Sequence, residues 1–279
     1  QNTIIGSQAG DSLTDADDNV AVGKGALGAD TLGSRSVAIG ATALAAQNFT
    51  TATNVYNVAV GYNAGNDITT GESNTFVGGL AGDKVTDGDS NTLIGQNSGT
   101  GGVELTTGSS NTLVGASMDT TAVDSASAMG LGFNLNCEAG FTTLGASTSD
   151  IRAPHGNVTW ATVSDERYKK DIVNSTAGLS FINALTPRTF KYKTLGELPE
   201  TFRAYEADST EVFKNSNTNH GFIAQEVKAA IDADSSIKDG FRLWDDREDG
   251  SQEVAEAALI PILVKAIQEL TARIAVLEG

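Results

Sequence analysis

The sequence predicts a mainly β protein, in which a parallel β-solenoid shaft precedes a small α+β domain that ends in a long coiled-coil helix. Three observations lead to this prediction. A short motif ending in glycine recurs through the first half, the charge balance changes near residue 150, and the last predicted helix has a heptad pattern. We expect a shaft over residues 1–146, a linker with the junction over 147–163, and a second domain over 164–279.

The charge of the chain is uneven along its length. Residues 1–150 carry fifteen acidic and three basic residues, whereas residues 151–279 carry twenty and fifteen, which indicates two different regions. The net charge of −17 repels phosphate backbones and anionic lipids, so we expect neither nucleic acid nor membrane insertion. The start has no signal-peptide pattern. Because the chain begins within a repeat, we interpret it as a fragment of a longer protein.

Seven clear copies of the repeat have Asn or Ser at their head, three mostly apolar residues, and a final glycine. The glycines are spaced by 17, 17, 21, 17, 17 and 20 residues: Gly6, Gly23, Gly40, Gly61, Gly78, Gly95 and Gly115. Weaker copies end near Gly130 and Gly145. A period this short has no room for a pair of helices. We therefore expect each unit to be a short strand, a turn and a second short strand.

Both faces of the predicted strands are apolar. The residue before each glycine is Ile or Val, so we expect this face to point into the stacked core. The intervening residue, such as Ala21 or Phe76, is apolar as well, and strands that are apolar on both faces are buried on both. One face can pack inside a coil, and the other needs a partner chain. The Asn and Gly positions suit side-chain-to-backbone bonding and positive φ.

These Asn-Val-Ala-Val-Gly-x-x-Ala units resemble the head repeats of trimeric autotransporter adhesins and the shafts of phage tail fibres. The resemblance covers residues 1–145 and implies three left-handed β-rolls around a threefold axis, although the period is longer than that of the adhesin repeat. The predicted fold is thus a trimeric β-solenoid. Longer intervals place insertions at residues 47–56 and 100–107, which are either receptor-binding loops or ordinary loop variation.

The second half has mixed secondary-structure signals. After linker-like residues 147–157, we expect a strand over 158–164, a short helix over 179–185 and a strand over 189–193. A polar insertion follows over 194–219, and residues 220–227 predict a strand that runs into a helix. A long helix is predicted over 254–278.

The final helix carries a short heptad seam. Its apolar residues alternate in spacing between three and four: Ile260, Leu263, Ile267, Leu270, Ile274 and Leu277. This pattern is compatible with a trimeric coiled coil, and the alternative is an amphipathic helix that lies on its own domain. Pro261 suits the first helical turn or marks a kink.

Four motifs in order resemble the C-terminal intramolecular chaperone of phage tailspikes and tail fibres, also called peptidase S74. They are Ser164-Asp-x-Arg-x-Lys169-x-x-Ile172, Leu185-x-Pro-x-x-Phe190, His220-Gly-Phe-Ile-Ala-Gln-Glu226 and Leu263-Val-Lys-Ala-Ile-Gln-Glu-Leu270. The resemblance spans residues 150–279. It implies a domain that trimerises, guides the shaft into register and then cuts itself off before the motif serine. The implied scissile bond is Val163–Ser164, with Ser164 as the nucleophile and Lys169 completing a Ser-Lys dyad.

The implied chemistry is a single-turnover serine autoproteolysis with no external substrate. A serine hydroxyl needs a base, and a lysine can serve when burial or nearby cations lower its pKa. Arg167 could lower the lysine pKa or bind a carboxylate. His220 and Glu226, in the third motif, could move a proton or orient the dyad, and His220 could equally be a structural residue at a strand end. The dyad could form within one chain or across subunits.

The expected partners follow from the resemblance. They are two further copies of the chain in a homotrimer, other virion tail proteins, and a host cell-surface receptor, either a glycan or a surface protein. The expected location is the virion tail appendage after assembly in the host cytoplasm. Two alternatives stay open: a fibre with a non-cleaving trimerisation domain, and a bacterial trimeric surface adhesin.

We expect no cofactor and no metal. Acidic turns at 15–18 and 87–89 do not recur with the repeat and lack Ca²⁺-loop spacing. Cys137 is the single cysteine, which excludes an internal disulfide or a Cys-based metal site and makes it a small apolar filler. No carboxylate pair indicates a glycosidase.

Overall fold

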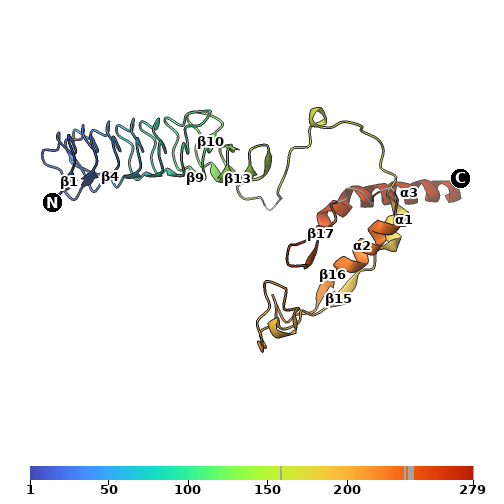
Figure 1. Cartoon of the computed structure of the whole chain (residues 1–279). Helices are drawn as coiled ribbons and strands as arrows, with labels where there is room; N and C mark the ends of the chain where they lie inside the picture. The colour runs from blue at the N-terminus through green and yellow to red at the C-terminus, as the bar shows by residue number, and fades with distance from the viewer. Residues whose placement is uncertain (158, 236, 238–241, 279) are drawn as a thin grey trace. The chain divides into compact units, whose positions relative to one another are not determined.

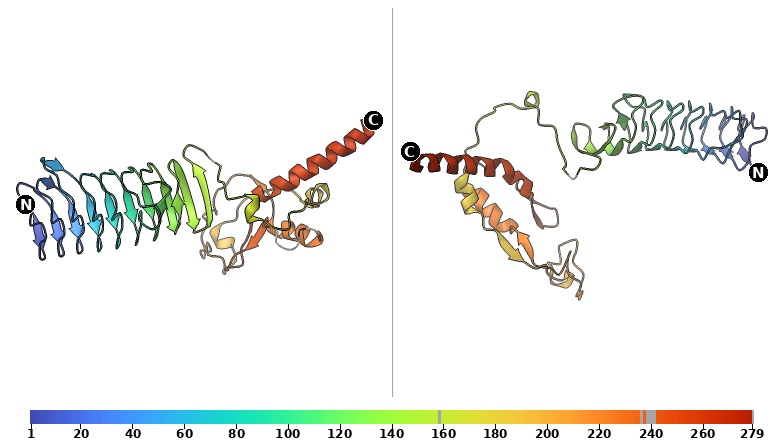
Figure 2. Two further views of the ribbon diagram at one scale, coloured as in Figure 1. Left: turned by 90° about the horizontal axis from the view of Figure 1, so that it is seen from above. Right: turned by 180° about the vertical axis from the view of Figure 1, so that it is seen from behind.

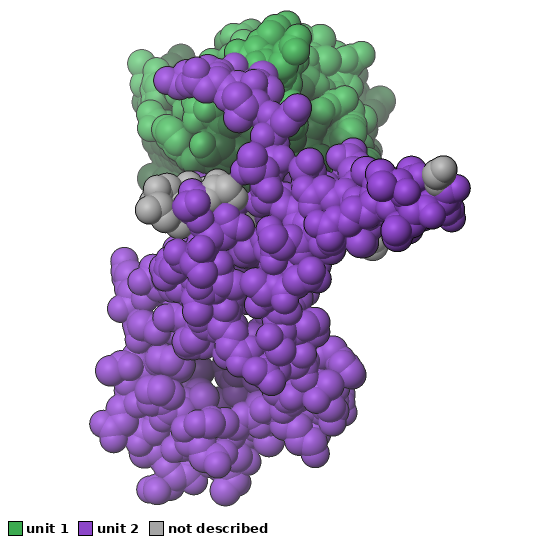
Figure 3. All heavy atoms as spheres, turned by 90° about the vertical axis from the view of Figure 1, so that its right-hand side faces the viewer, with its two compact units in different colours: residues 1–168 green, residues 169–279 purple. Residues whose placement is uncertain are grey.

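A computed structural model describes residues 1–157, 159–235, 237 and 242–278 of the protein. The chain forms two compact units, residues 1–168 and 169–279 (Figure 3). The boundary between them lies between Tyr168 and Lys169, inside the first motif of the second half. We describe each unit by itself.

Unit 1 is built around a ten-stranded sheet in which successive coils stack in sequence order (Figures 1 and 2). Nine strands run parallel, and the tenth returns antiparallel at the end of the stack. They are β1 (Thr3–Ile5), β2 (Val20–Val22), β4 (Val37–Ile39), β6 (Val58–Val60), β7 (Thr75–Val77), β8 (Thr92–Ile94), β9 (Thr112–Val114), β11 (Met129–Phe133), β13 (Phe141–Ala146) and β14 (Ser149–Pro154). The predicted mainly β class with a parallel solenoid is confirmed.

The predicted second strand of each unit is found at only two places among the described residues. These are the pairs β3 (Gly33–Ser34) with β5 (Thr53–Asn54), and β10 (Asp119–Thr120) with β12 (Asn136–Cys137). In most coils the chain turns directly after the strand, because the N–H three residues on donates to the carbonyl of the strand-ending glycine, as in Ala81 to Gly78. The expected strand-turn-strand unit is therefore mostly wrong.

The inner face of the sheet is the opposite of the predicted one. The middle residue of the strands β2 to β9 is fully buried, and these residues are Ala21, Ala38, Ala59, Phe76, Leu93 and Leu113. The residue before each glycine faces outward and is half-buried or exposed, with Ile39 39% exposed and Ile94 36% exposed. The outer row of apolar side chains is thus the face that stays partly exposed to solvent in a single chain.

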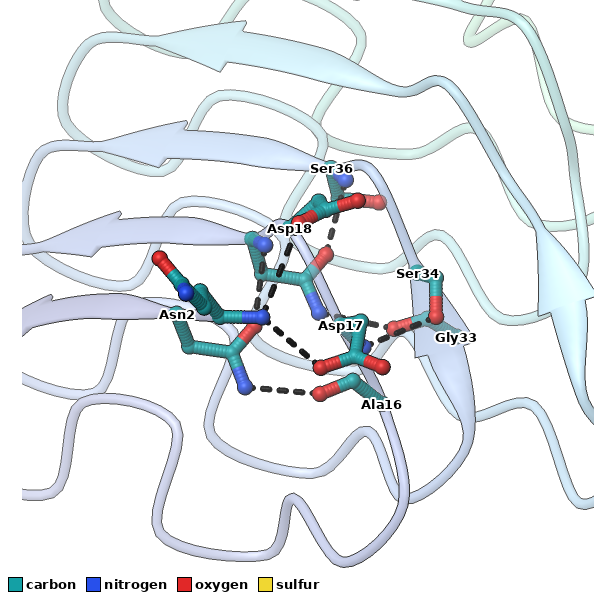
Figure 4. Close-up of polar contacts among 9 residues, drawn as sticks. Asn2, Ala16, Asp17, Asp18, Gly33, Ser34 and Ser36 are labelled. Atoms are coloured by element: carbon teal, nitrogen blue, oxygen red, sulfur yellow. Dashed lines mark hydrogen bonds and ion pairs between the residues drawn. The ribbon is translucent and has the colours of Figure 1, made fainter.

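A ladder of asparagine side chains joins the coils from the inside. Oδ1 of Asn2 accepts the backbone N–H of Asn19 at 2.9 Å, and Oδ1 of Asn19 accepts that of Ser36 at 2.7 Å. Each amide also donates to a carbonyl of the coil it spans, as Asn19 does to Gly33 at 2.9 Å (Figure 4). The same bonds recur at Asn57, Asn74, Asn91 and Asn111. The expected side-chain-to-backbone role of these residues is confirmed.

Among the head residues from Asn19 to Asn111, Ser36 is the one that is not asparagine, and a residue of the first insertion supplies the amide group that it lacks. Ser36 lacks an amide, and Gln47 at the start of the insertion takes its place in the ladder. The Gln47 amide donates to Ser36 at 3.1 Å and to the buried carboxylate of Asp30 at 2.6 Å, while its carbonyl oxygen accepts a bond from Asn57 at 2.9 Å. Within the longer interval of 21 residues, Gln47 thus supplies additional hydrogen bonds to three buried polar side chains.

Cys137 is fully buried inside the solenoid, as expected for an apolar filler. Burial raises the pKa of its thiol from 9.0 to about 11. Because the folded state favours the protonated thiol, this contribution to stability is lost as the pH rises from about 9 toward 11.

We expect Cys137 to resist iodoacetamide at pH 8 in the folded chain and to react at least about a hundredfold faster in urea, because alkylation needs an accessible thiolate. Mass spectrometry of quenched samples measures the rate. Equal labelling in buffer and in urea would show that the last coils are not closed around the thiol.

The shaft extends further than predicted. The register pairs Leu131 with Val114, so Gly132, and not Gly130, is the counterpart of Gly115. The residues expected to start the linker instead form a turn and strand β14, which pairs antiparallel with β13 from Ser149 to Pro154.

The strand expected over 158–164 includes Val158, which lies outside the described residues. Residues 159–164 form no continuous strand. One of them, Ala161, makes an isolated antiparallel bridge with Arg152 of β14.

Unit 2 is a small α+β domain. It contains α1 (Leu179–Ala184), β15 (Arg188–Phe190), η2 (Leu195–Glu197), β16 (Asn219–Gly221), α2 (Ala224–Ala233), β17 (Trp244–Asp246), β18 (Gln252–Val254), η3 (Glu256–Leu259) and α3 (Ile260–Glu278). The predicted first helix and the strand-to-helix passage at 220–227 are confirmed. The final helix begins later than predicted, because Val254 pairs in β18, and Pro261 lies in the first turn of α3.

The core of unit 2 holds α3 by a narrow face. Ile262 belongs to a buried cluster that includes Phe181, Val227 and Leu243, and Ala266, one turn further along α3, is buried as well. Further along α3, a carboxylate oxygen of Glu269 accepts the backbone N–H of Leu179 at 3.0 Å and so caps the start of α1. Among the described helices, none is both long and apolar enough to cross a membrane.

Candidate functional site

The predicted dyad lies in an exposed stretch at the unit boundary. Ser164 belongs to unit 1 and Lys169 to unit 2, and both side chains are exposed in the single chain. Between them, η1 (Glu166–Tyr168) makes one turn of 3₁₀ helix.

Arg167 binds a carboxylate, which is one of its two predicted roles. Its guanidinium donates to both oxygens of Asp165, at 2.9 and 2.6 Å, and its backbone N–H donates to the same side chain at 2.8 Å. The hydrogen bond to Asp165 raises the pKa of Arg167. The pair closes the turn directly after Ser164 and thereby shapes the motif. The sequence analysis did not single out Asp165, although it is part of the first motif.

Glu226 is held by a partner that the sequence analysis did not identify. Arg188 at the start of β15 donates to both carboxylate oxygens of Glu226 in the first turn of α2, at 3.0 and 2.7 Å. This hydrogen bond lowers the pKa of Glu226 and raises that of Arg188. Glu226 is therefore ionised at neutral pH, which suits an orienting role better than proton donation. In the sequence, the position of Arg188 inside the second motif was the one indication that it could belong to the site.

His220 occupies the middle of β16, opposite Thr189 of β15. Its side chain is exposed. The short ladder of β15 and β16 thus carries His220 as well as Arg188, which binds Glu226. The third motif forms one local structure, a strand followed by a helix.

The described residues contain no cluster of three or more His, Cys, Asp or Glu side chains suited to hold a metal ion. The two acidic turns take part in links between coils instead. The backbone N–H of Asp17 donates to the Ser34 hydroxyl at 2.9 Å (Figure 4), and Asp89 accepts the backbone N–H of Glu72 at 2.7 Å.

Comparison with known proteins gives one match. Residues 164–235 match the peptidase S74 family model, described as the chaperone of endosialidase. No match was found among curated proteins or solved structures. The matched region begins at Ser164 and contains the Ser164, Arg188, His220 and Glu226 positions described above. It covers the first three of the four motifs.

The match supports a family related to autoproteases, and a β-solenoid precedes the matched region. Residues 164–235 are therefore similar to a chaperone-of-endosialidase domain, and they follow a β-solenoid.

Proposed function

We propose that the chain is part of a phage tail fibre or tailspike whose C-terminal chaperone assembles three shafts in register and then releases itself by cutting the Val163–Ser164 bond. The mature shaft is a virion tail appendage that binds a receptor on the host surface. The family match supports the chaperone role, and the following observations support trimerisation and cleavage.

The exposed seam of α3 is the observation that carries this proposal. The helix packs on its own domain through Ile262 and Ala266, and the heptad residues point elsewhere. All six are exposed, from 41% at Leu263 to 85% at Leu277. An unpartnered apolar seam of two and a half heptads is unfavourable in water and is relieved by packing against other copies.

The solenoid has its own need for a partner. Its outer row of Val and Ile side chains is only half-covered in one chain. Bringing three parallel solenoids into one register involves contacts far apart in sequence, and strand edges stay exposed during the search. A C-terminal clamp shortens this search. Its later removal takes away the easiest refolding route, so the assembled shaft is trapped kinetically.

The proposed cleavage is an attack by Ser164 on the carbonyl of the residue before it. The Ser164 Oγ adds to the Val163 carbonyl carbon, Lys169 accepts the hydroxyl proton, and the peptide nitrogen leaves with a proton to give an ester. Water then hydrolyses the ester to a Val163 carboxylate and restores the serine hydroxyl. Because Lys169 is exposed in one chain, we propose that neighbouring copies bury it, which makes cleavage depend on assembly.

Intact mass under denaturing conditions tests the cleavage. We expect the wild-type chain to separate into residues 1–163 and 164–279, and Ser164→Ala to stay whole, since loss of a nucleophile reduces the rate by on the order of 10⁶-fold. Ser175→Ala is the matched control and should cleave normally, because the Ser175 hydroxyl makes a local bond, to the carbonyl of Ala177. A wild-type chain that stays as intact as Ser164→Ala would contradict self-cleavage. Native mass of Ser164→Ala should equal three chains.

A further inference from the structure

The residues before the predicted scissile bond are attached to the end of the shaft. The backbone N–H of Ala161 donates to the carbonyl of Arg152 at 2.8 Å, and the N–H of Arg152 donates back to the carbonyl of Ala161 at 2.9 Å. The Thr162 hydroxyl donates to the carbonyl of Asp150 at 3.3 Å. All of these residues belong to unit 1.

Strand β14 has a free edge that suits this attachment. It is the last strand of the sheet, with β13 on one side. The backbone N–H and C=O of Arg152 both bond to Ala161. On its other side Arg152 lies opposite Thr143 of β13, and these two residues form a non-hydrogen-bonded pair of the antiparallel ladder. Ala161 and Thr162 thus contact the outer edge of β14 through one β-bridge and one side-chain bond, at the edge that an added strand uses in β-augmentation.

The next residue toward the scissile bond reaches a groove. Val163 lines an open groove of about 530 Å³ at the end of the solenoid, and its own side chain is 58% exposed. The other lining residues are Asn134, Asn136, Ser147, Thr148, Asp150, Thr162 and Tyr168. One wall is therefore made of polar side chains from the last turns of the shaft.

We propose that the hairpin β13–β14 is a docking strand that positions the junction for cleavage. This inference rests on the proposed self-cleavage. Arg152 acts as a positioning residue through its backbone, by holding Ala161 two residues before the bond to be cut. Fixing a segment in this way reduces the freedom that the reaction must otherwise remove.

The docking strand couples cleavage to completion of the shaft. β13 pairs in parallel with β11 over five residues, from Met129 with Thr142 to Phe133 with Ala146. The hairpin β13–β14 can consequently pair with the sheet only after the coil that contains β11 has stacked on the shaft. Cleavage thus takes place at a bond that the completed shaft holds in position. After release, residues 159–163 stay on the shaft and cover the edge of its last strand.

Two substitutions at one position separate the backbone bond from the side chain. The Arg152 side chain forms an ion pair with Glu138 and lies over the Phe141 ring at 5.0 Å. Arg152→Ala and Arg152→Pro both lose these contacts, but only proline loses the N–H that holds Ala161. Proline is tolerated on an edge strand whose N–H does not face the neighbouring strand. We expect Arg152→Pro to cleave about tenfold more slowly than Arg152→Ala, as for one lost hydrogen bond, because the alanine variant keeps the backbone N–H.

Equal rates for all three chains, or equal slowing in both variants, would overturn the docking role. Hydrogen exchange in the uncleaved Ser164→Ala chain gives an independent measurement. We expect the amide of Ala161 to be protected there and to exchange faster when Arg152→Pro is added, because the carbonyl that accepts this amide is kept but the second bond of the bridge, from the Arg152 N–H, is lost. An unprotected Ala161 amide would overturn the inference even if cleavage occurs. A protected amide in a wild-type chain that never cleaves would support docking while contradicting the proposed autoproteolysis.

Discussion

We expect Gly78→Ala to destabilise the shaft by about 4 kcal/mol or more, enough to prevent folding of the central coils. Gly78 directly follows β7 and has φ of +138°, and a Cβ at this position would lie 2.5 Å from the carbonyl oxygen of Gly95 in the next coil. The same close stacking recurs along the row of strand-ending glycines. A methyl group would therefore both strain the backbone and separate two coils.

Gly79→Ala is the matched control for this prediction. It adds the same methyl group one residue later, where a Cβ meets nothing within 4 Å, and we expect its effect to stay within about 0.5 kcal/mol. Urea unfolding followed by circular dichroism, with both substitutions in the Ser164→Ala chain, measures the difference. If the two variants unfold at the same urea concentration, the glycine row does not stack as described.

The solenoid could be predicted from sequence because its period is explicit, but its inner face could not. The outer positions carry Val and Ile, whereas several inner positions carry only Ala, so residue size favours the wrong face. Side chains from two positions of each coil fill the interior: the middle strand residue and the residue six positions after it. Buried Leu27 and Leu44, six residues after Ala21 and Ala38, complete those coils.

The reverse arrangement is found where the inner strand residue is large. Six residues after Phe76 is Gly82, whose Cβ would lie 2.6 Å from the Phe76 ring. Likewise, Gly99 follows Leu93, with a Cβ 2.8 Å from that side chain. This complementary pattern of large and small residues is visible in the sequence only once the repeats are aligned by their coils.

The candidate site was predictable to the extent that its motifs are local. Ser164, Arg167 and Lys169 lie within six residues, and the first motif begins where the family match begins. The pairing of Glu226 with Arg188 was not predictable, since the two residues are 38 positions apart. No sequence periodicity relates the first residue of β15 to the first turn of α2. The proposed burial of Lys169 by neighbouring copies cannot be read from local sequence either.

Ile267→Asp is expected to separate the proposed trimer into single chains while leaving unit 2 folded. Ile267 is 62% exposed on the seam of α3, so one chain loses little packing. In a trimer, three carboxylates would be brought into one apolar layer, and we expect the dissociation constant to rise by roughly a hundredfold or more. Gln268→Asp places the same charge on the next, exposed residue, outside the seam, and should leave the trimer intact. Analytical ultracentrifugation of Ser164→Ala chains measures both.

The same seam substitution tests whether assembly and cleavage are linked. If neighbouring copies bury Lys169, then Ile267→Asp in the otherwise wild-type chain should also stop the cut at Val163–Ser164, although this helix position lies about a hundred residues from the bond. Gln268→Asp should cleave normally. A monomeric Ile267→Asp chain that still cleaves at the wild-type rate would place the complete dyad within one chain, because a site that needs a neighbour cannot react without one.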